Sequence, residues 1–518
     1  MALLPFGIRA ARAILPLFAL ALGFVLFYMY AMNTGVGSLL SAIPIINSNS
    51  DSSDGNPTPA HDPPRYKPTP TWVPPPVFDP FPLLAMSSAE IEPPPIPEYN
   101  VPRPDMHQEY GLDRPPPLYI GFTRQWPMLL QAVVSYITAG WPADNIYVVE
   151  NTGTHNSNRE GKLSLQNPFY LNHSTLLRLG VHVVQTPVLL SFAQLQNFFM
   201  SQAYEGEHRY YFYSHQDVVV FSFEDGPDNN QRPGDRPWQF YDKDDELAAM
   251  FPNPARQPGY RTIYENCLRE LNATLEMGER WGQRWFQYDH LALINRDAME
   301  MVGGYDSLIP YYNSDCDING KLVMGGWTLK HRRVGLINDV SSVVTNLEAF
   351  YRNPAITPSF TDPNPLPPEQ EAKIVSDKAE KEAKEKAAQE EAARIAAEVP
   401  TTEDSKSARA RRGEMPTDPI EYFRVLNKVG VEMGWHKYRD HDNVRNTWQS
   451  SQRGGDGEPF HYDALGFGRG FWVLAEAGRD VYRQKWGHRD CDIAEGTALK
   501  LDDQWKVEKD WEKKKEGE

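Results

Sequence analysis

The residues best placed to do chemistry are the polar triplet His215-Gln216-Asp217, which interrupts an otherwise apolar run over residues 209–223. The flanking segments 210–213 and 218–221 are aromatic or β-branched without polar alternation, which is typical of a strand buried on both faces. A buried carboxylate needs a partner, and at the carboxyl end of a strand in an open α/β sheet that partner is commonly a ligand or a metal. The alternative is that Asp217 only caps the following turn.

Strands and helices alternate on either side of this triplet. The pattern predicts strands at 118–122, 146–149 and 181–185, and helices at 128–139 and 192–204. Such alternation indicates an α/β fold with a mixed, mostly parallel sheet flanked by helices, in which ligands bind at the strand ends.

Beyond the triplet, the pattern continues with a polar loop over 224–257, long enough to be a lid or an insertion. The spacing then predicts a helix at 261–279, a strand at 285–295, and helices at 296–302 and 319–324.

Composition limits the classes of function. The chain has 518 residues and a formal net charge of −17, which disfavours a nucleic-acid partner. Only three cysteines occur, Cys267, Cys316 and Cys491, so we expect packing rather than a disulfide framework to hold the core together.

The N-terminal part has the pattern of a membrane anchor. Residues 13–32 carry no charge and match the length of a bilayer-spanning helix, and Arg9 and Arg12 precede them. The charge bias predicts a cytosolic tail at 1–12 and the bulk of the chain across the membrane; a cleaved signal peptide is the competing interpretation. Residues 33–117 are rich in proline and polar residues, which is typical of an extended stem.

Residues from about 118 to 340 resemble the family 2-type glycosyltransferases, which have the nucleotide-sugar-binding GT-A fold. The resemblance implies a GT-A-like glycosyltransferase domain at 118–350. The motifs that carry the resemblance occur in the family's order: 119–124 (YIGFTR), 146–151 (IYVVEN), Asn197, 215–217 (HQD) in the place of the DxD motif, 303–306 (GGYD), 313–317 (NSDCD) and 326–327 (GW).

The resemblance implies a role for each matching position. Asp217, with His215, would hold a divalent metal, Mn²⁺ or Mg²⁺, against the diphosphate of a nucleotide-sugar donor. The turn residues Thr123 and Arg124, together with Glu150 and Asn151, would contact the nucleotide.

On the acceptor side, Asp315 would be the base that activates the acceptor hydroxyl, with Asp317 as the second candidate. His215 departs from the family pattern, since it replaces the first acidic residue of DxD, and this leaves open whether metal binding is weaker, involves the imidazole or is lost.

The remaining chain divides into a linker at 351–416, which includes a charged, helix-prone or disordered segment at 369–398, and a C-terminal region at 417–518. The C-terminal region contains a partial echo of residues 262–327. The paired segments are 286–289 with 460–463, 304–306 with 478–480, and 315–318 with 490–493. Chance similarity is the alternative to an internal repeat. Cys316 and Cys491 occupy equivalent positions in the echo, which argues against a disulfide between them.

The chain is therefore interpreted as a type II membrane glycosyltransferase of the Golgi or another secretory compartment, acting on a glycan or glycoconjugate acceptor with inversion. Sequons at Asn172 and Asn272 are consistent with that location. The alternative is a transferase-like domain that has lost catalysis and serves as a scaffold or glycan-binding protein. A metal-dependent hydrolase is disfavoured, because neither a nucleophile elbow nor a histidine-rich cluster occurs in the sequence.

Overall fold

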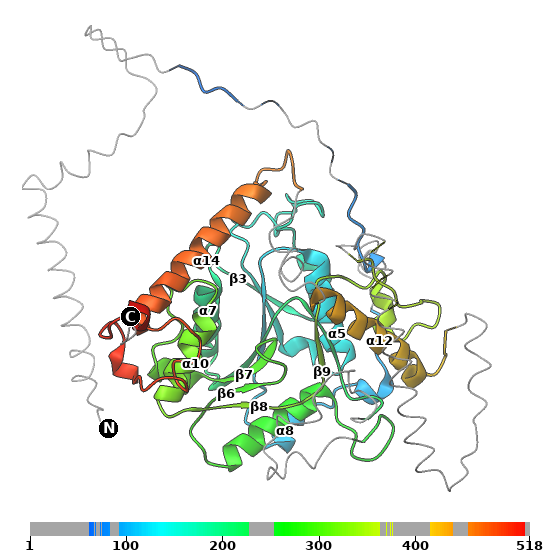
Figure 1. The fold of residues 1–518 in the computed structure, drawn as a ribbon. Helices are drawn as coiled ribbons and strands as arrows, with labels where there is room; N and C mark the ends of the chain where they lie inside the picture. The colour runs from blue at the N-terminus through cyan, green and yellow to red at the C-terminus, as the bar shows by residue number, and fades with distance from the viewer. Residues whose placement is uncertain are drawn as a thin grey trace, which may run out of the picture. The chain divides into compact units, whose positions relative to one another are not determined.

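The computed structural model of the chain (Figure 1) describes residues 62–66, 68, 73, 75–82, 93–226, 253–362, 369, 373, 376, 415–438 and 454–512. The chain divides into two units, Met1–Pro68 and Thr69–Glu518, and every element named below lies in the second. The predicted anchor at 13–32 and the interior of the predicted lid, 227–252, lie outside the described residues. In the part of the chain that is described, no helix combines the length and apolar character needed to cross a membrane.

The nine strands found in the described residues form a seven-stranded sheet in the order β3-β2-β1-β4-β7-β6-β8 and a two-stranded sheet of β5 and β9. Their bounds are β1 Leu118–Phe122, β2 Ile146–Glu150, β3 His182–Gln185, β4 Tyr210–Ser214, β5 Val218–Phe221, β6 Trp281–Trp285, β7 Leu291–Asn295, β8 Thr328–His331 and β9 Leu336–Asp339. β1 to β4 are parallel, β7 runs antiparallel to both β4 and β6, and β8 is parallel to β6. The predicted mixed, mostly parallel α/β sheet is confirmed.

Helices cover both faces of the large sheet. The α-helices are α4 Met106–Glu109, α5 Trp126–Thr138, α6 His173–Arg178, α7 Phe192–Glu205, α8 Ile263–Glu276, α9 Arg296–Met301, α10 Ser314–Met324, α12 Pro419–Tyr438 and α14 Ala464–Trp486. One core lies among α5, α8, α12, the small sheet and one face of the large sheet, whereas α7, α9 and α10 bury the opposite face. Figure 1 shows α12 near β9 and α14 beside α10, and residue contacts join both pairs.

Local sequence explains where several helices begin. Ser191 caps α7 in a capping box with Gln194, and Thr262 accepts a hydrogen bond from the Glu265 amide at the start of α8. Asp463 caps α14 through the amides of Leu465 and Gly466. These caps satisfy backbone donors that a helix leaves unpaired in its first turn.

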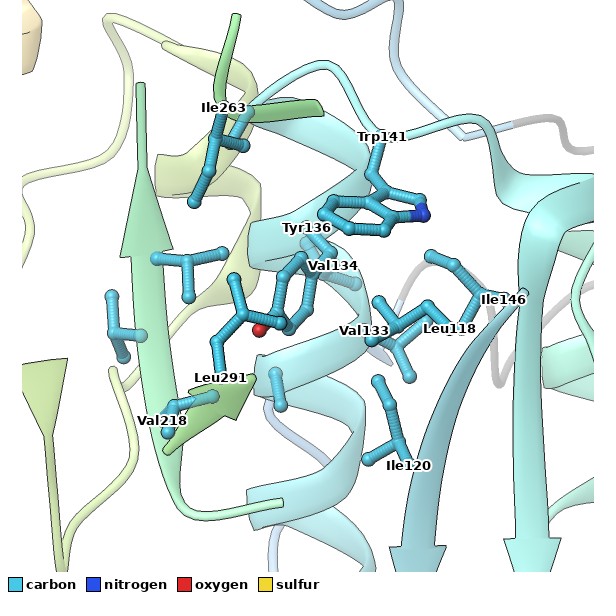
Figure 2. Close-up of a cluster of buried hydrophobic side chains, with 14 of the residues drawn as sticks. Leu118, Ile120, Val133, Val134, Tyr136, Trp141, Ile146, Val218, Ile263 and Leu291 are labelled. Atoms are coloured by element: carbon cyan, nitrogen blue, oxygen red, sulfur yellow. The ribbon is translucent and has the colours of Figure 1, made fainter. Parts of the chain in front are cut away.

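The core beneath α5 holds the small sheet against the large one (Figure 2). Side chains from β1, such as Leu118 and Ile120, and from α5, such as Val133 and Tyr136, are fully buried together with Val218 of β5. At roughly 25 cal/mol per Å² of apolar surface, burying one such side chain contributes about 2 kcal/mol. This packing fixes the chain that leaves β4 and enters β5.

Two segments that were each predicted to be a single strand form two strands in the structure. The run 209–223 forms β4 and β5, which belong to different sheets, and the triplet His215-Gln216-Asp217 makes the crossing between them. The run 285–295 was predicted as one strand, but β6 and β7 form a hairpin whose turn spans residues 286–290, with Tyr288 at a φ of 47°. Both breaks place polar residues at strand ends.

The expectation that Cys316 and Cys491 do not form a disulfide with each other was wrong. Cys316 at the start of α10 forms a disulfide with Cys491, with the two Cα atoms 5.0 Å apart, and Cys267 is a buried free thiol. Around the disulfide, Ile309, Tyr482 and Trp486 form a small core between the sheet domain and α14. The C-terminal region is thus covalently tied to the first turn of α10.

The sequence echo is not accompanied by a structural repeat. Residues 286–289 form the turn of the β6–β7 hairpin, whereas 460–463 precede α14. Gly304 lies in a turn at a φ of 64°, but its counterpart Gly478 lies inside α14. In the described parts of the C-terminal region, 415–438 and 454–512, the secondary structure is helical with no strand.

Candidate functional site

Strand register gathers the site at one end of the two sheets. Ser214 pairs with Leu291 in the antiparallel β4–β7 ladder, so the residues that follow β4 lie beside those that precede β7. The His215 amide donates to the His290 carbonyl at 3.1 Å. In the small sheet Val218 pairs with Asp339, and the Val340 amide donates to the Asp217 carbonyl at 2.9 Å.

The side chains at this junction form one polar group of buried and half-buried residues, which we call the His-Asp cluster: His215, Asp217, Asp289, His290, Asp339 and Lys437. Its members come from the β4–β5 crossing, the β6–β7 turn, the end of β9 and the last turn of α12. Three carboxylates and one ammonium give the cluster a formal charge of −2 when both imidazoles are neutral.

The ammonium of Lys437 lies between the carboxylates of Asp217 and Asp339. Its Nζ donates to Asp217 Oδ2 at 2.6 Å and also to Asp339 Oδ1. Burial alone would lower the pKa of Lys437, but the two carboxylates raise it above the ordinary lysine value, and the same contact lowers the pKa of Asp339 despite its burial. Asp217, the predicted metal ligand, is therefore already paired with a cation of the chain itself.

The two histidines are oriented by different carboxylates. His290 Nε2 lies 3.4 Å from Asp339 Oδ2, and His215 Nδ1 lies 3.8 Å from Asp217 Oδ1. The other ring nitrogens, His215 Nε2 and His290 Nδ1, are buried without a hydrogen-bond partner among the described residues. Asp289 Oδ2 lies 3.5 Å from that His215 nitrogen.

Electrostatics favours a cation here. Burial would lower the pKa of His215, but the carboxylates of Asp289, Asp217 and Asp339 raise it to about 9. His215, Asp289 and His290 each present one ligand atom, and these three atoms lie within 4.8 Å of one another. These residues can hold a metal ion, because imidazole nitrogen and carboxylate oxygen are ordinary metal ligands.

Gln216, the middle residue of the triplet, joins the end of β4 to the turn after β1. Its Nε2 donates to the Arg124 carbonyl at 2.7 Å, and its Oε1 accepts from the Thr123 amide at 3.4 Å. β1 and β4 are neighbours at the point where successive connections leave in opposite directions along the sheet, which is where open α/β sheets bind ligands.

Arg124 is a buried cation at this point. Its side chain lies over the ring of Phe467 of α14 at 4.0 Å, and the residue is only 6% exposed. Its Nε has no hydrogen-bond partner in the described parts of the chain. Burial lowers the pKa of the guanidinium, but arginine remains charged at neutral pH, so the site can accept an anion.

Glu150 and Asn151, at the end of β2, are fully engaged by protein groups. Glu150 accepts hydrogen bonds from His173 and Gln185, both at 2.8 Å, and from Asn158 at 2.5 Å. The Asn151 amide exchanges hydrogen bonds with the backbone of Leu190 at 2.9 and 2.7 Å. Both residues lie at the carboxyl end of β2, on the side of the sheet where ligand binding was predicted. Their hydrogen bonds hold the neighbouring loops in place.

Asp315 lies at the start of α10 and faces the β6–β7 turn. The Tyr288 hydroxyl donates a hydrogen bond to Asp315 Oδ2 at 2.6 Å. Because Asp289 directly follows Tyr288 in the turn, both carboxylates are neighbours of Tyr288. Asp315 is half-buried and in reach of solvent, as a general base must be.

Asp317, the second candidate base, is fully buried. Its Oδ1 accepts from Lys485 at 2.7 Å and from the Trp486 indole at 2.9 Å, and Lys321 Nζ lies 3.3 Å from its Oδ2. These contacts anchor α14 to α10.

The sequence argument missed Asp289, His290, Asp339 and Lys437. The first two follow β6 and precede β7, so a polar pair between two apolar runs was the available signal, as it was for His215. Asp339 and Lys437 join the cluster only through tertiary contacts, 98 positions apart in the chain, and no local pattern marks them.

No protein-family model matches the chain, and no curated protein sequence matches it. Among solved structures, it is similar to a mannosyltransferase, PcManGT from Pyrobaculum calidifontis, in complex with GDP-Man and Mn²⁺. The sequences are 11% identical, and the TM-score is 0.26. The matched region covers 44% of this chain and 60% of that one.

Proposed function

We propose that the chain is a nucleotide-sugar-dependent glycosyltransferase whose active site lies at the ends of β1 and β4. The observation that carries the proposal is the buried Arg124 guanidinium at the β1–β4 junction, whose Nε has no hydrogen-bond partner among the residues that the structure describes. A buried cation at this position of an α/β sheet suits the diphosphate of a nucleotide-sugar donor. The order of motifs along the chain, from the turn after β1 to α10, supports the same class.

In this proposal Asp315 is the general base that removes the proton of the acceptor hydroxyl. Tyr288 holds the carboxylate through the 2.6 Å hydrogen bond and limits its rotation. Attack opposite the leaving diphosphate would invert the anomeric configuration. Asp317 has no free access to an acceptor, because it is buried among Lys321, Lys485 and Trp486, and we assign it a structural role.

Negative charge develops on the diphosphate as the glycosidic bond breaks. A divalent cation bound at the His-Asp cluster would neutralise part of that charge. Arg124 supplies a second, fixed positive charge on the β1 side, and Gln216 keeps the two sides in register through its hydrogen bonds to the Thr123–Arg124 turn.

The alternative, a catalytically inactive scaffold or glycan-binding protein, is favoured by one observation. The Lys437 ammonium is hydrogen-bonded to the Asp217 carboxylate, which stands where the DxD motif would offer a free metal ligand. Turnover separates the two functions, because a scaffold binds ligand without releasing nucleoside diphosphate.

The test is calorimetric binding of a panel of nucleotide sugars to the full-length protein in detergent, followed by measurement of nucleoside diphosphate release. The proposed enzyme binds one class of donor and releases its diphosphate when acceptor glycans are added. Binding without release would favour the scaffold, and the absence of both would reject the transferase.

Membrane anchoring through residues 13–32 and a lumenal Golgi or secretory location are part of the same proposal. Of the two sequons, Asn272 lies on α8 with its side-chain amide in an exposed hydrogen bond to Glu276, whereas the Asn172 side chain caps α6. We expect an endoglycosidase-sensitive band that Asn272→Gln shifts. An unmodified chain in a eukaryotic secretory host would contradict the lumenal location.

A further inference from the structure

We propose that His215, Asp289 and His290 bind one divalent transition-metal ion through two imidazole nitrogens and one carboxylate. The inference deepens the proposed function, because it names the metal ligands of that site. It rests on the proposed function only for what the ion does and not for whether the ion binds.

The first observation is a pair of buried ring nitrogens without a hydrogen-bond partner among the described residues. His290 is 6% exposed, and its Nδ1 has no hydrogen-bond partner among the described residues. His215 Nε2 is also buried without a hydrogen bond in this part of the chain, and Asp289 Oδ2 lies 3.5 Å from it. A buried polar atom without a hydrogen-bond partner is unfavourable, so two in one place require an explanation. A shared metal ion satisfies both at once.

The second observation is the identity of the groups behind the two rings. His290 presents its other nitrogen to Asp339 at 3.4 Å, and His215 presents its other nitrogen to Asp217 at 3.8 Å. Metal-bound histidines usually donate their second N–H to a carboxylate, which fixes the tautomer and orients the ring. The arrangement leaves His215 Nε2 and His290 Nδ1 as the ligand atoms.

The third observation is the position of Lys437. It binds both orienting carboxylates, Asp217 at 2.6 Å and Asp339 at its Oδ1. The ammonium thus offsets one of the two negative charges that lie behind the histidines and leaves Asp289 as the carboxylate on the ligand side. The formal charge of −2 that remains on the cluster matches one divalent cation.

The ligand set predicts metal preference. Two imidazoles favour transition metals such as Mn²⁺, Co²⁺ or Zn²⁺, whereas Mg²⁺ prefers an all-oxygen site and keeps several of its waters. Asp217 then acts as a positioning residue for His215 and is not itself a ligand.

The test is metal binding without any sugar nucleotide. The full-length protein is stripped with a chelator and titrated with Mn²⁺, Co²⁺ or Mg²⁺, and bound metal is counted after desalting. Pulsed electron paramagnetic resonance of the Mn²⁺ form then reports nitrogen nuclei coupled to the metal. We expect about one Mn²⁺ or Co²⁺ per chain, two coupled imidazole nitrogens and at least tenfold weaker Mg²⁺ binding.

Variants assign the ligands. His215→Asn and His290→Gln should each remove one nitrogen coupling and weaken Mn²⁺ binding at least a hundredfold, and Asp289→Asn should weaken it with both couplings kept. Asp217→Asn should weaken binding only about 10- to 100-fold with both couplings kept. His182→Gln, at an exposed histidine of β3, is the matched control and should bind as the wild type does.

The outcomes are decisive in the wild type alone, so a variant that fails to fold does not obscure them. In the wild type, no stoichiometric binding, binding without nitrogen coupling, or binding with a single coupled nitrogen would overturn the proposed ligand set. Stoichiometric, nitrogen-coupled metal in a protein that releases no nucleoside diphosphate would uphold the metal site and reject the transferase.

Discussion

Lys437 Nζ donates a 2.6 Å hydrogen bond to Asp217 Oδ2, which joins residues 220 positions apart in the chain. Through this contact the last turn of α12 becomes part of the polar cluster at the end of β4. Asp217, which the sequence pattern predicts to be a metal ligand, is thereby paired with a cation of the chain itself. The C-terminal region is needed to complete the cluster.

Replacing Lys437 with methionine should strongly destabilise the fold. The change leaves Asp217 and Asp339 buried without their cation, and breaking a buried ion pair from one side costs about 3–5 kcal/mol. Lys428→Met, at an exposed position of the same helix, should change the free energy of unfolding by less than about 0.5 kcal/mol. Denaturant unfolding of the two variants measures the difference, and equal stabilities would show that the ion pair is not formed.

Reduction of the Cys316–Cys491 disulfide should destabilise the protein by about 2–5 kcal/mol, because the bond closes a long loop between residues 175 positions apart. The thermal midpoint of the wild type should therefore fall on adding reductant, while that of Cys491→Ser, already lower, should not move. A peptide containing both cysteines should appear in a non-reducing digest. A wild-type midpoint that ignores reductant would contradict the bond.

Asp317→Asn should lower stability. The carboxylate is fully buried and pairs with Lys485 at 2.7 Å, so its neutralisation leaves a buried ammonium undercompensated, at a cost of about 3 kcal/mol. Asp480→Asn, an exposed aspartate on α14, is the control and should unfold as the wild type does. An Asp317→Asn variant as stable as that control but devoid of turnover would assign Asp317 to catalysis.

Glu150→Gln should destabilise the protein in a pH-dependent way. Burial raises the pKa of Glu150, but hydrogen bonds from His173, Asn158 and Gln185 outweigh it and hold the pKa below the ordinary value of 4.5. The carboxylate therefore contributes its full stabilisation above that value and loses it as the pH falls through the lower, folded-state pKa.

The expected loss for Glu150→Gln is about 2 kcal/mol at neutral pH, shrinking in acid below about pH 4. Urea unfolding at several pH values measures it, with the exposed Glu160→Gln as control. A difference that stayed constant or grew in acid would show that the carboxylate is not held by these hydrogen bonds.

Local pattern was sufficient where an element is bounded by clear signals. β1 was predicted at 118–122, its observed bounds, because the apolar run follows three prolines and ends at a polar turn. The hairpin of β6 and β7 was missed because its turn, residues 286–290 (FQYDH), contains no glycine, proline or asparagine, and Tyr288 itself adopts the left-handed conformation.

Only part of the candidate site could be predicted from the sequence, because local pattern marks residues at the ends of elements and does not mark tertiary contacts. His215, Asp217 and Asp315 lie at element ends and could be picked out, whereas Lys437 lies in the last turn of an ordinary amphipathic helix. Its role depends on where α12 packs against β9, which no periodicity encodes. The disulfide was not predicted, because Cys316 and Cys491 occupy equivalent positions in the sequence echo and a repeat would place them in separate copies. The two segments have different structures, so that argument does not apply.

The most direct test of the account is the rate of nucleoside diphosphate release by the full-length protein and by Asp315→Asn, with the preferred donor and an acceptor glycan. The account predicts that the variant folds with wild-type stability and binds the donor, but releases diphosphate at least a hundredfold more slowly, as expected on loss of a general base. Release at the wild-type rate would contradict the assignment of Asp315, and no donor-dependent release by the wild type would contradict the transferase itself.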